Sequence, residues 1–196
     1  MKRISGNNNR QRGFTLLEVM IALLIFGVGL LTVAALQTVS KRANYEAVQR
    51  TTASFLALDM LERMRVNKGR LNRYTQGNME LGGGQRGVPG TPCTSLADAC
   101  DGIDIANADL YEWEQRLDGV AEDQGGNATG GLLSPTACLD GPGGGGTGVY
   151  TVAIAWRGVT ELTDPTADDC GDDTGLYGAD NEFRRILVIS AFIDAT

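Results

Sequence analysis

An apolar stretch near the N-terminus constrains this chain more than any other feature of its sequence. Residues Phe14 to Leu36 form a run of 23 whose only charged member is Glu18. In a helix that rises about 1.5 Å per residue, the run is roughly 34 Å long, enough to cross a hydrocarbon core of about 30 Å. No cleavage site of the A-x-A kind follows Leu36, as it would after a secretory signal. The sequence therefore predicts a membrane-spanning helix that stays on the protein.

The charges on either side of this run predict its orientation. Four basic residues precede it, and only two closely follow it: Lys2, Arg3, Arg10 and Arg12 before, Lys41 and Arg42 after. Because basic residues are enriched on the cytoplasmic side, we expect a cytoplasmic N-terminus and an exported remainder.

Glu18 needs an explanation, because an acidic side chain near the centre of a bilayer costs about 3 kcal/mol. In the simpler interpretation it reaches water by tilting or snorkelling, since it lies one turn from the start of the span. In the other interpretation it has a partner charge. A cut between Gly13 and Phe14 creates an α-amino group one turn away, which could pair with Glu18 of a neighbouring copy in an assembly.

The sequence GFTLLEV at positions 13–19 resembles the prepilin leader junction of type IV pilins and of type II secretion pseudopilins. The resemblance implies that a prepilin peptidase cleaves after Gly13 and methylates Phe14. It also implies that Glu18 guides the docking of subunits. The leader is then residues 1–13, and the assembly helix is residues 14–36.

Charge is distributed unevenly along the chain, whose net charge is −7. Without the leader the chain has 13 basic and 24 acidic residues, or −11. Residues 37–74 hold eight basic and three acidic groups, whereas 75–196 hold five basic and 20 acidic groups. The acidic outer part argues against nucleic-acid binding. We interpret the basic segment as a periplasmic surface or a subunit interface.

All four cysteines lie in the part predicted to be exported, where disulfides can form. Three connectivities are possible, and we favour Cys93–Cys100 with Cys138–Cys170. A zinc site is the alternative, but the chain has no CxxC pair and no histidine.

Residues 37–68 are expected to extend the membrane helix, since Phe14 to Lys68 contains no proline and only two glycines. The extension carries a helical apolar stripe that includes Leu56, Met60, Leu61 and Met64. We expect the stripe to pack under a sheet of the same chain; exclusive binding of a partner is the alternative. Asn67 to Gly69 provide a stop signal, with Gly69 suited to a left-handed conformation.

Residues 69–196 are expected to form a single head, because the 160 residues beyond the span suffice for one compact domain. This part holds 23 of the 27 glycines and all five prolines, so it is rich in loops, notably 75–92 and 140–148. A short helix is predicted at 108–117, with Asp109 near its start. Strands are predicted at 149–156 and 184–193, with 136–139 a further candidate. The predicted fold is α+β, with three or four antiparallel strands across the helix.

The order of these elements resembles the PilV family of type IV pilus minor pilins. The shared features are a Cys-bearing loop, an Asp-Leu-x-x-Trp helix, a Tyr-x-Val-x-x-x-Trp strand, an acidic Cys-bearing loop and an Arg-Arg-x-x-Val strand. The resemblance implies a low-abundance subunit of a priming or tip complex. The implied partners are the prepilin peptidase, other minor pilins, the major pilin, the assembly platform and, at the tip, an adhesin. The head is then periplasmic before assembly and reaches the cell surface with the pilus.

Two other classes remain open. A minor pseudopilin of a type II secretion system carries the same leader, and a membrane-tethered binding module or enzyme uses 14–36 as a plain anchor.

Motifs that would indicate catalysis or metal binding are weak in this sequence. Gly82, Gly84 and Gly87 match GxGxxG but follow no predicted strand, so they do not indicate a nucleotide site. The acidic residues from Asp164 to Asp173 do not have EF-hand spacing. Without histidine there is no hydrolase triad, and we expect no enzyme, cofactor or metal.

Overall fold

The computed structural model describes residues 13–76, 80–95, 98–120, 122 and 130–196. The leader cations that predict orientation, residues 2–12, lie outside this range. The chain divides into two compact units, with the boundary between Ala43 and Asn44. Most of the predicted helix extension, residues 44–68, therefore belongs to the same unit as the head.

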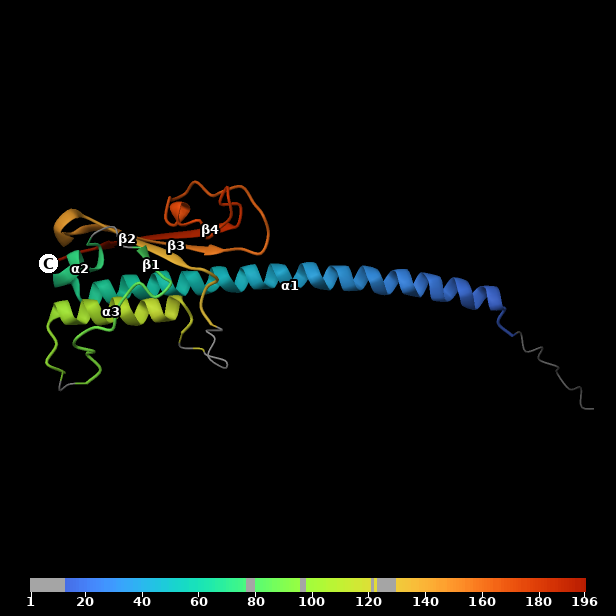
Figure 1. Cartoon of the computed structure of the whole chain (residues 1–196), viewed down its shortest axis with the longest axis horizontal. Coiled ribbons are helices and arrows are strands. Elements are labelled where there is room, and N and C mark those ends of the chain that lie inside the picture. The colour runs from blue at the N-terminus through green and yellow to red at the C-terminus, as the bar shows by residue number, and fades with distance from the viewer. Residues whose placement is uncertain (1–12, 77–79, 96–97, 121, 123–129) are drawn as a thin grey trace, which may run out of the picture. The chain divides into compact units, whose positions relative to one another are not determined.

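Helix α1 (Leu16–Val66) runs through both units and is the longest ribbon in Figure 1. In the first unit none of its residues is buried, because the buried positions begin at Gln49. Among the described residues, α1 is the one helix long and apolar enough to cross a membrane. Its most apolar window has no buried residue.

The second unit is an α+β structure built on the later part of α1. Its four-stranded sheet has the order β1-β2-β3-β4, and all neighbouring strands are antiparallel. The strands are β1 (Glu80–Leu81), β2 (Thr136–Asp140), β3 (Gly148–Arg157) and β4 (Arg184–Ile193). The other helical elements are η1 (Lys68–Arg70), α2 (Leu71–Tyr74), α3 (Gly102–Leu117), η3 (Gly143–Gly145) and η4 (Asp172–Thr174). The predicted fold class is confirmed.

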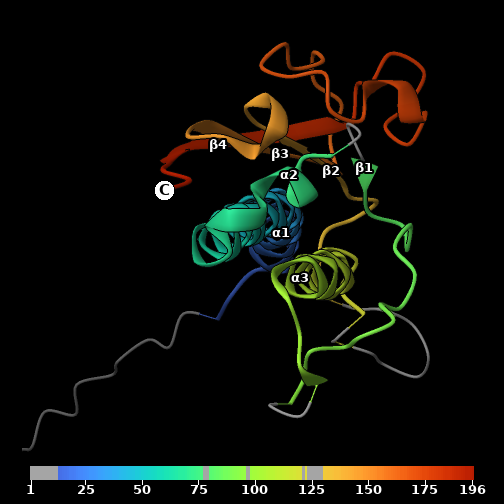
Figure 2. The same cartoon turned by 90° about the vertical axis from the view of Figure 1, so that its left-hand side faces the viewer.

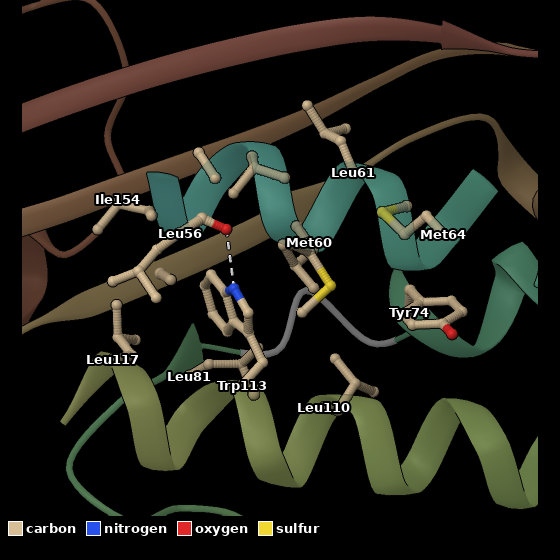
Figure 3. Packing of buried hydrophobic residues seen from close by; sticks show 14 of the residues in the cluster. Leu56, Met60, Leu61, Met64, Tyr74, Leu81, Leu110, Trp113, Leu117 and Ile154 are labelled. Atoms are coloured by element: carbon tan, nitrogen blue, oxygen red, sulfur yellow. Dashed lines mark hydrogen bonds between the residues drawn. The ribbon is translucent and has the colours of Figure 1, made fainter. Parts of the chain in front are cut away.

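Within this unit, α1 lies between the sheet and α3 (Figures 1 and 2). Leu56, Met60, Leu61 and Met64 of α1 are all buried. Trp113 of α3 packs against them and donates a hydrogen bond from Nε1 to the Leu56 carbonyl oxygen at 2.8 Å (Figure 3). The stripe is thus covered on one side by the sheet and on the other by α3. The sequence predicted the cover by the sheet but not the cover by α3.

Two helix boundaries differ from the sequence prediction. Helix α1 ends at Val66, and Gly69 is not left-handed but lies in η1, which leads directly into α2. Helix α3 begins six residues earlier than predicted, at Gly102. Its true N-cap is Asp101, which forms a capping box with Asp104.

Asp109, predicted near the start of α3, lies in its middle and serves another purpose. It accepts hydrogen bonds from Arg63 Nη1 at 2.6 Å and from the Tyr74 hydroxyl at 2.5 Å. These contacts join α3 to α1 and α2, so the carboxylate fixes the packing of three helices. Together with burial, the hydrogen bond to Asp109 raises the pKa of Tyr74.

Candidate functional site

The residues predicted to act in processing and assembly lie at the start of α1: Gly13 and Phe14 precede the helix, and Glu18 is in its first turn. Thr15 immediately precedes the helix, and its Oγ1 accepts a hydrogen bond from the Glu18 backbone N–H at 3.3 Å. Thr15 therefore occupies the N-cap position and Glu18 the third helical position, as in the first half of a capping box. An acidic side chain in the first turn is also stabilised by the positive end of the helix dipole. This local role of Thr15 was missed, although the spacing Thr-x-x-Glu carries it.

Glu18 lies in a shallow apolar groove that is formed by side chains on one face of α1. The groove is lined by Phe14, Glu18, Val19, Ala22, Leu23 and Phe26. Within the described part of the chain, the Glu18 carboxylate accepts no hydrogen bond and forms no ion pair. The groove thus presents one unpaired carboxylate among apolar side chains, with Phe14 one turn away. Such a site suits a cation carried by an apolar partner.

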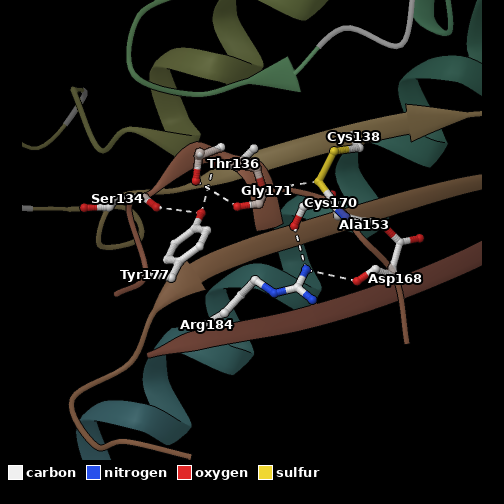
Figure 4. The surroundings of a disulfide bond; sticks show 10 residues. Ser134, Thr136, Cys138, Ala153, Asp168, Cys170, Gly171, Tyr177 and Arg184 are labelled. Carbon is white, nitrogen blue, oxygen red and sulfur yellow. Dashed lines mark hydrogen bonds between the residues drawn. A yellow bond between two sulfur atoms is a disulfide. The ribbon is translucent and has the colours of Figure 1, made fainter. Parts of the chain in front are cut away.

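Two disulfides close loops of the second unit: Cys93–Cys100 and Cys138–Cys170. The second joins β2 to the acidic loop, and Cys170 is buried (Figure 4). Gly171 follows with φ +78, where a Cβ atom would lie 3.0 Å from Tyr177 and 3.2 Å from Thr136. Glycine is therefore required for the loop to approach the sheet this closely.

The acidic loop is attached to the sheet by Arg184, the first residue of β4. Its guanidinium pairs with Asp164 at 2.7 Å and donates to the Pro165 carbonyl oxygen. It also donates to the carbonyl oxygens of Asp168 and Cys170 (Figure 4). Arg184 is buried and all its nitrogens are engaged, so it acts as a structural anchor. Among the described residues, no group of three or more acidic or cysteine side chains is arranged to hold a metal ion.

The glycine-rich loop after β1 forms an anion-binding cradle of backbone N–H groups, and carboxylates of the same chain occupy this cradle. Backbone N–H groups of Gly82, Gln85 and Arg86 donate to the Glu114 carboxylate at 2.8, 3.0 and 2.7 Å. Those of Gly83 and Gly84 donate to Asp118 at 2.8 and 2.9 Å. The amides that a GxGxxG motif would offer to a phosphate are therefore occupied. In the sequence, this loop appeared only as a connection.

Several basic residues of the segment 37–74 have partners within the same chain, and two of these partners, Asp109 and Thr196, lie in the head. Arg63 binds Asp59 and Asp109. Burial lowers the pKa of Arg63, but the two carboxylates together outweigh burial and leave the pKa raised. Arg65 pairs with Glu62, and Lys68 donates to Thr196 O. In contrast, no hydrogen bond or ion pair of the described residues engages the side chains of Lys41, Arg42 and Arg50.

A long apolar N-terminal helix, a small antiparallel sheet and disulfide-closed loops define a pilin-like α+β fold, in which α1 is long and apolar enough to cross a membrane. Comparison with family models gives two matches. Residues 8–34 match the prokaryotic N-terminal methylation motif, and residues 35–111 match a family described as type IV pilin Tt1218.

Over residues 8–111 the chain is thus similar to type IV pilins. That family consists of structural subunits and not of enzymes. No curated protein and no solved structure matched the chain.

Proposed function

We propose that this chain is a minor pilin, processed between Gly13 and Phe14 and incorporated into a type IV pilus through α1. The observation that carries the proposal is the unpaired Glu18 carboxylate in the groove between Phe14 and Phe26. The match to the methylation motif at residues 8–34 supports cleavage at Gly13 and methylation of Phe14.

In the proposed mechanism Glu18 sets the register of the fibre. The α-amino group of Phe14 of one subunit enters the groove of a neighbour and pairs with its Glu18. Two opposite charges among apolar side chains interact strongly, and removal of one partner leaves an uncompensated charge that costs about 3–5 kcal/mol. A subunit without the carboxylate is therefore inserted in the membrane but poorly taken up by the fibre.

The place of the subunit in the fibre belongs to the same proposal. The resemblance to the PilV family supports a position in a priming or tip complex with other minor pilins, where an adhesin binds. The charge asymmetry around Phe14 to Leu36 supports a cytoplasmic N-terminus and a periplasmic head before assembly. The prepilin peptidase, the assembly platform and the major pilin are the further partners.

The test compares Glu18→Ala with Glu62→Ala, which removes an exposed acid farther along the same helix. We expect both variants to be inserted in the inner membrane at normal levels. Recovery of Glu18→Ala in sheared pili should fall at least tenfold, whereas Glu62→Ala should be recovered normally. Normal recovery of Glu18→Ala in sheared pili would overturn the proposed role of the carboxylate.

A second experiment separates the pilus from a secretion pseudopilus. Deletion of the gene should abolish or reduce surface pili and twitching while type II secretion continues. Loss of secretion with normal pili would instead assign the chain to the pseudopilins.

A further inference from the structure

A pocket of about 500 Å³ lies within the second unit, between α1 and the start of β4. This volume is in the range of small-ligand sites. The pocket shares no residue with the groove around Glu18. Its walls come from α1, from β3 and β4, and from the loop between these two strands; they include Ala47, Arg50, Trp156, Leu162 and Ile186.

The pocket is rich in positive charge, although the head is acidic. The charged side chains that line it are three arginines and one glutamate: Arg50, Arg184, Arg185 and Glu46. Arg184 pairs with Asp164, and Arg185 pairs with Glu46. The guanidinium of Arg50 is exposed and makes no hydrogen bond or ion pair with any described residue. The charge of Arg50 is therefore available to an anionic group from outside.

The pocket wall also contains a buried donor that has no acceptor. Trp156 is 3% exposed, and its indole Nε1 is buried without a hydrogen-bond partner in the described part of the chain. Trp113 differs, because its Nε1 donates to the Leu56 carbonyl oxygen. Buried polar groups are normally hydrogen-bonded, so an unsatisfied indole N–H indicates an acceptor that comes from elsewhere. A carboxylate suits the pocket, because its oxygens can accept from Trp156 and from Arg50 together.

One wall of the pocket is the start of an unpaired strand edge. Strand β4 pairs with β3 on one side, and no other backbone hydrogen bond between described residues reaches 186–193. The loop between β3 and β4 covers only the chain just before this edge, where Leu162 N–H donates to the Glu182 carbonyl oxygen. From Ile186 to Ile193 the strand has no charge and no proline, which usually protect an edge. The backbone beside the pocket is therefore open to an extended peptide.

We propose that the pocket binds an acidic side chain of another protein, carried by an extended segment that pairs with the edge of β4. The carboxylate accepts hydrogen bonds from Arg50 and from Nε1 of Trp156, and the segment continues along the edge from Ile186. Glu46 does not oppose this binding strongly, because Arg185 neutralises it at 3.3 Å. A free carboxylate makes only the contacts in the pocket and binds more weakly. The interaction is a property of the head and does not depend on the proposed role in a pilus.

The test follows the indole N–H signals of the full-length protein in detergent by NMR. The chain has two tryptophans, so Trp113, which already has an acceptor, is the internal control. Trp156→Phe or Trp113→Phe assigns the two signals. The probe is a short peptide of alternating threonine and valine with an aspartate at each end, so that either direction of pairing brings an acid to the pocket. The matched probe has asparagine at both ends.

We expect the aspartate peptide to move the Trp156 signal downfield and to leave the Trp113 signal in place. The asparagine peptide should bind at least fivefold more weakly, because it lacks the charge that Arg50 requires. An unmoved Trp156 signal, or equal affinity for the two peptides, overturns the proposal.

Two arginine variants test the pocket itself. Arg50→Gln should weaken binding of the aspartate peptide at least fivefold. Arg42→Gln changes another exposed arginine of α1 that has no partner among the described residues, and it should bind as the wild type does. Both residues are exposed, so neither change should unfold the head. Unchanged binding in Arg50→Gln, or an equal loss in both variants, overturns the proposal.

A single capped aspartate, with an acetyl group and a methylamide in place of the flanking chain, tests the contribution of the strand edge. It should bind at least tenfold more weakly than the aspartate peptide. Equal affinity would mean a pocket for small acids and overturns the proposal of a peptide partner. None of these measurements depends on Glu18 or on recovery in pili, so their failure is distinct from failure of the proposed function.

Discussion

Helix α1 has two parts that differ in how their apolar residues are covered. Before Ala43 none of its residues is buried, although the sequence there is almost wholly apolar. After Asn44 one face is buried in the core and polar groups bind the head: Glu46 accepts from Val159 N–H, and Gln49 bonds to residues 131 and 133. The second part has its cover within the chain, and the first requires lipid or other subunits.

The two parts of α1 therefore contribute to different processes, one to the stability of the head and the other to membrane insertion and assembly. The later part contributes to the stability of the head, so changes there should alter unfolding but not membrane insertion. The earlier part contributes nothing to the head core, so changes there should alter assembly but not the stability of the head.

The largest effect is expected from Trp113→Ala. This side chain is fully buried between α3 and α1, and its loss leaves a cavity and removes the hydrogen bond to the Leu56 carbonyl oxygen. We expect the free energy of unfolding of the head to fall by about 3–5 kcal/mol. Phe55→Ala, which changes an exposed residue of α1, is the control and should cost less than about 0.5 kcal/mol. Urea titration of the detergent-solubilised protein measures both, and a loss below about 1 kcal/mol for Trp113→Ala would contradict the account.

The next effect concerns the disulfide Cys138–Cys170, whose cysteines are 32 residues apart. Replacement of both by serine should lower the free energy of unfolding by about 2–4 kcal/mol, because the unfolded chain gains freedom. Cys93 and Cys100 are only seven apart, so the corresponding double variant should lose less. The two variants can be compared by thermal unfolding at equal concentration. A larger loss for the shorter loop would show that the acidic loop does not stabilise the sheet.

A smaller effect is expected from Glu114→Gln, a change that conserves shape. The Glu114 carboxylate is fully buried and accepts three backbone N–H groups, one of which an amide NH₂ cannot satisfy. The loss should be about 1–3 kcal/mol. Glu112→Gln, at a partly exposed ion pair, should be nearly neutral. Hydrogen exchange of residues 82–86 provides the local readout, and unchanged protection in Glu114→Gln would contradict the cradle.

The smallest effect is expected from Asp101→Asn at the start of α3. Hydrogen bonds from the backbone N–H groups of Asp104 and Ile103 lower the pKa of the Asp101 carboxyl. A carboxylate whose pKa is lowered by folding stabilises the fold at pH values above its pKa in the unfolded chain, which is about 3.9. This stabilisation is lost as the pH falls through the pKa of the same group in the folded chain. The variant should therefore melt slightly below the wild type at pH 7, and the difference should vanish in acid. A difference in melting temperature that grows in acid would contradict this prediction.

The sequence allowed much of this fold to be predicted, because its strongest patterns are local. The apolar stripe from Ala53 to Met64 and the β-branched runs of β3 and β4 have clear periods, and the α+β class follows from them. The start of α3 was not predicted, because the apolar spacing of Leu110, Trp113 and Leu117 marks only its later turns. Asp101 and Asp104 nevertheless have capping-box spacing. The cradle around Glu114 could not be foreseen, since five backbone amides at 82–86 meet carboxylates about 30 residues away only in the folded chain.

The central claim is that the first part of α1 is an assembly segment exposed by cleavage at Gly13. Mass spectrometry of the N-terminal peptide of the protein recovered from sheared pili tests it most directly. The account predicts a peptide that begins at an N-methylated Phe14. Recovery of the protein only from membranes, with an intact N-terminus at Met1, would contradict it.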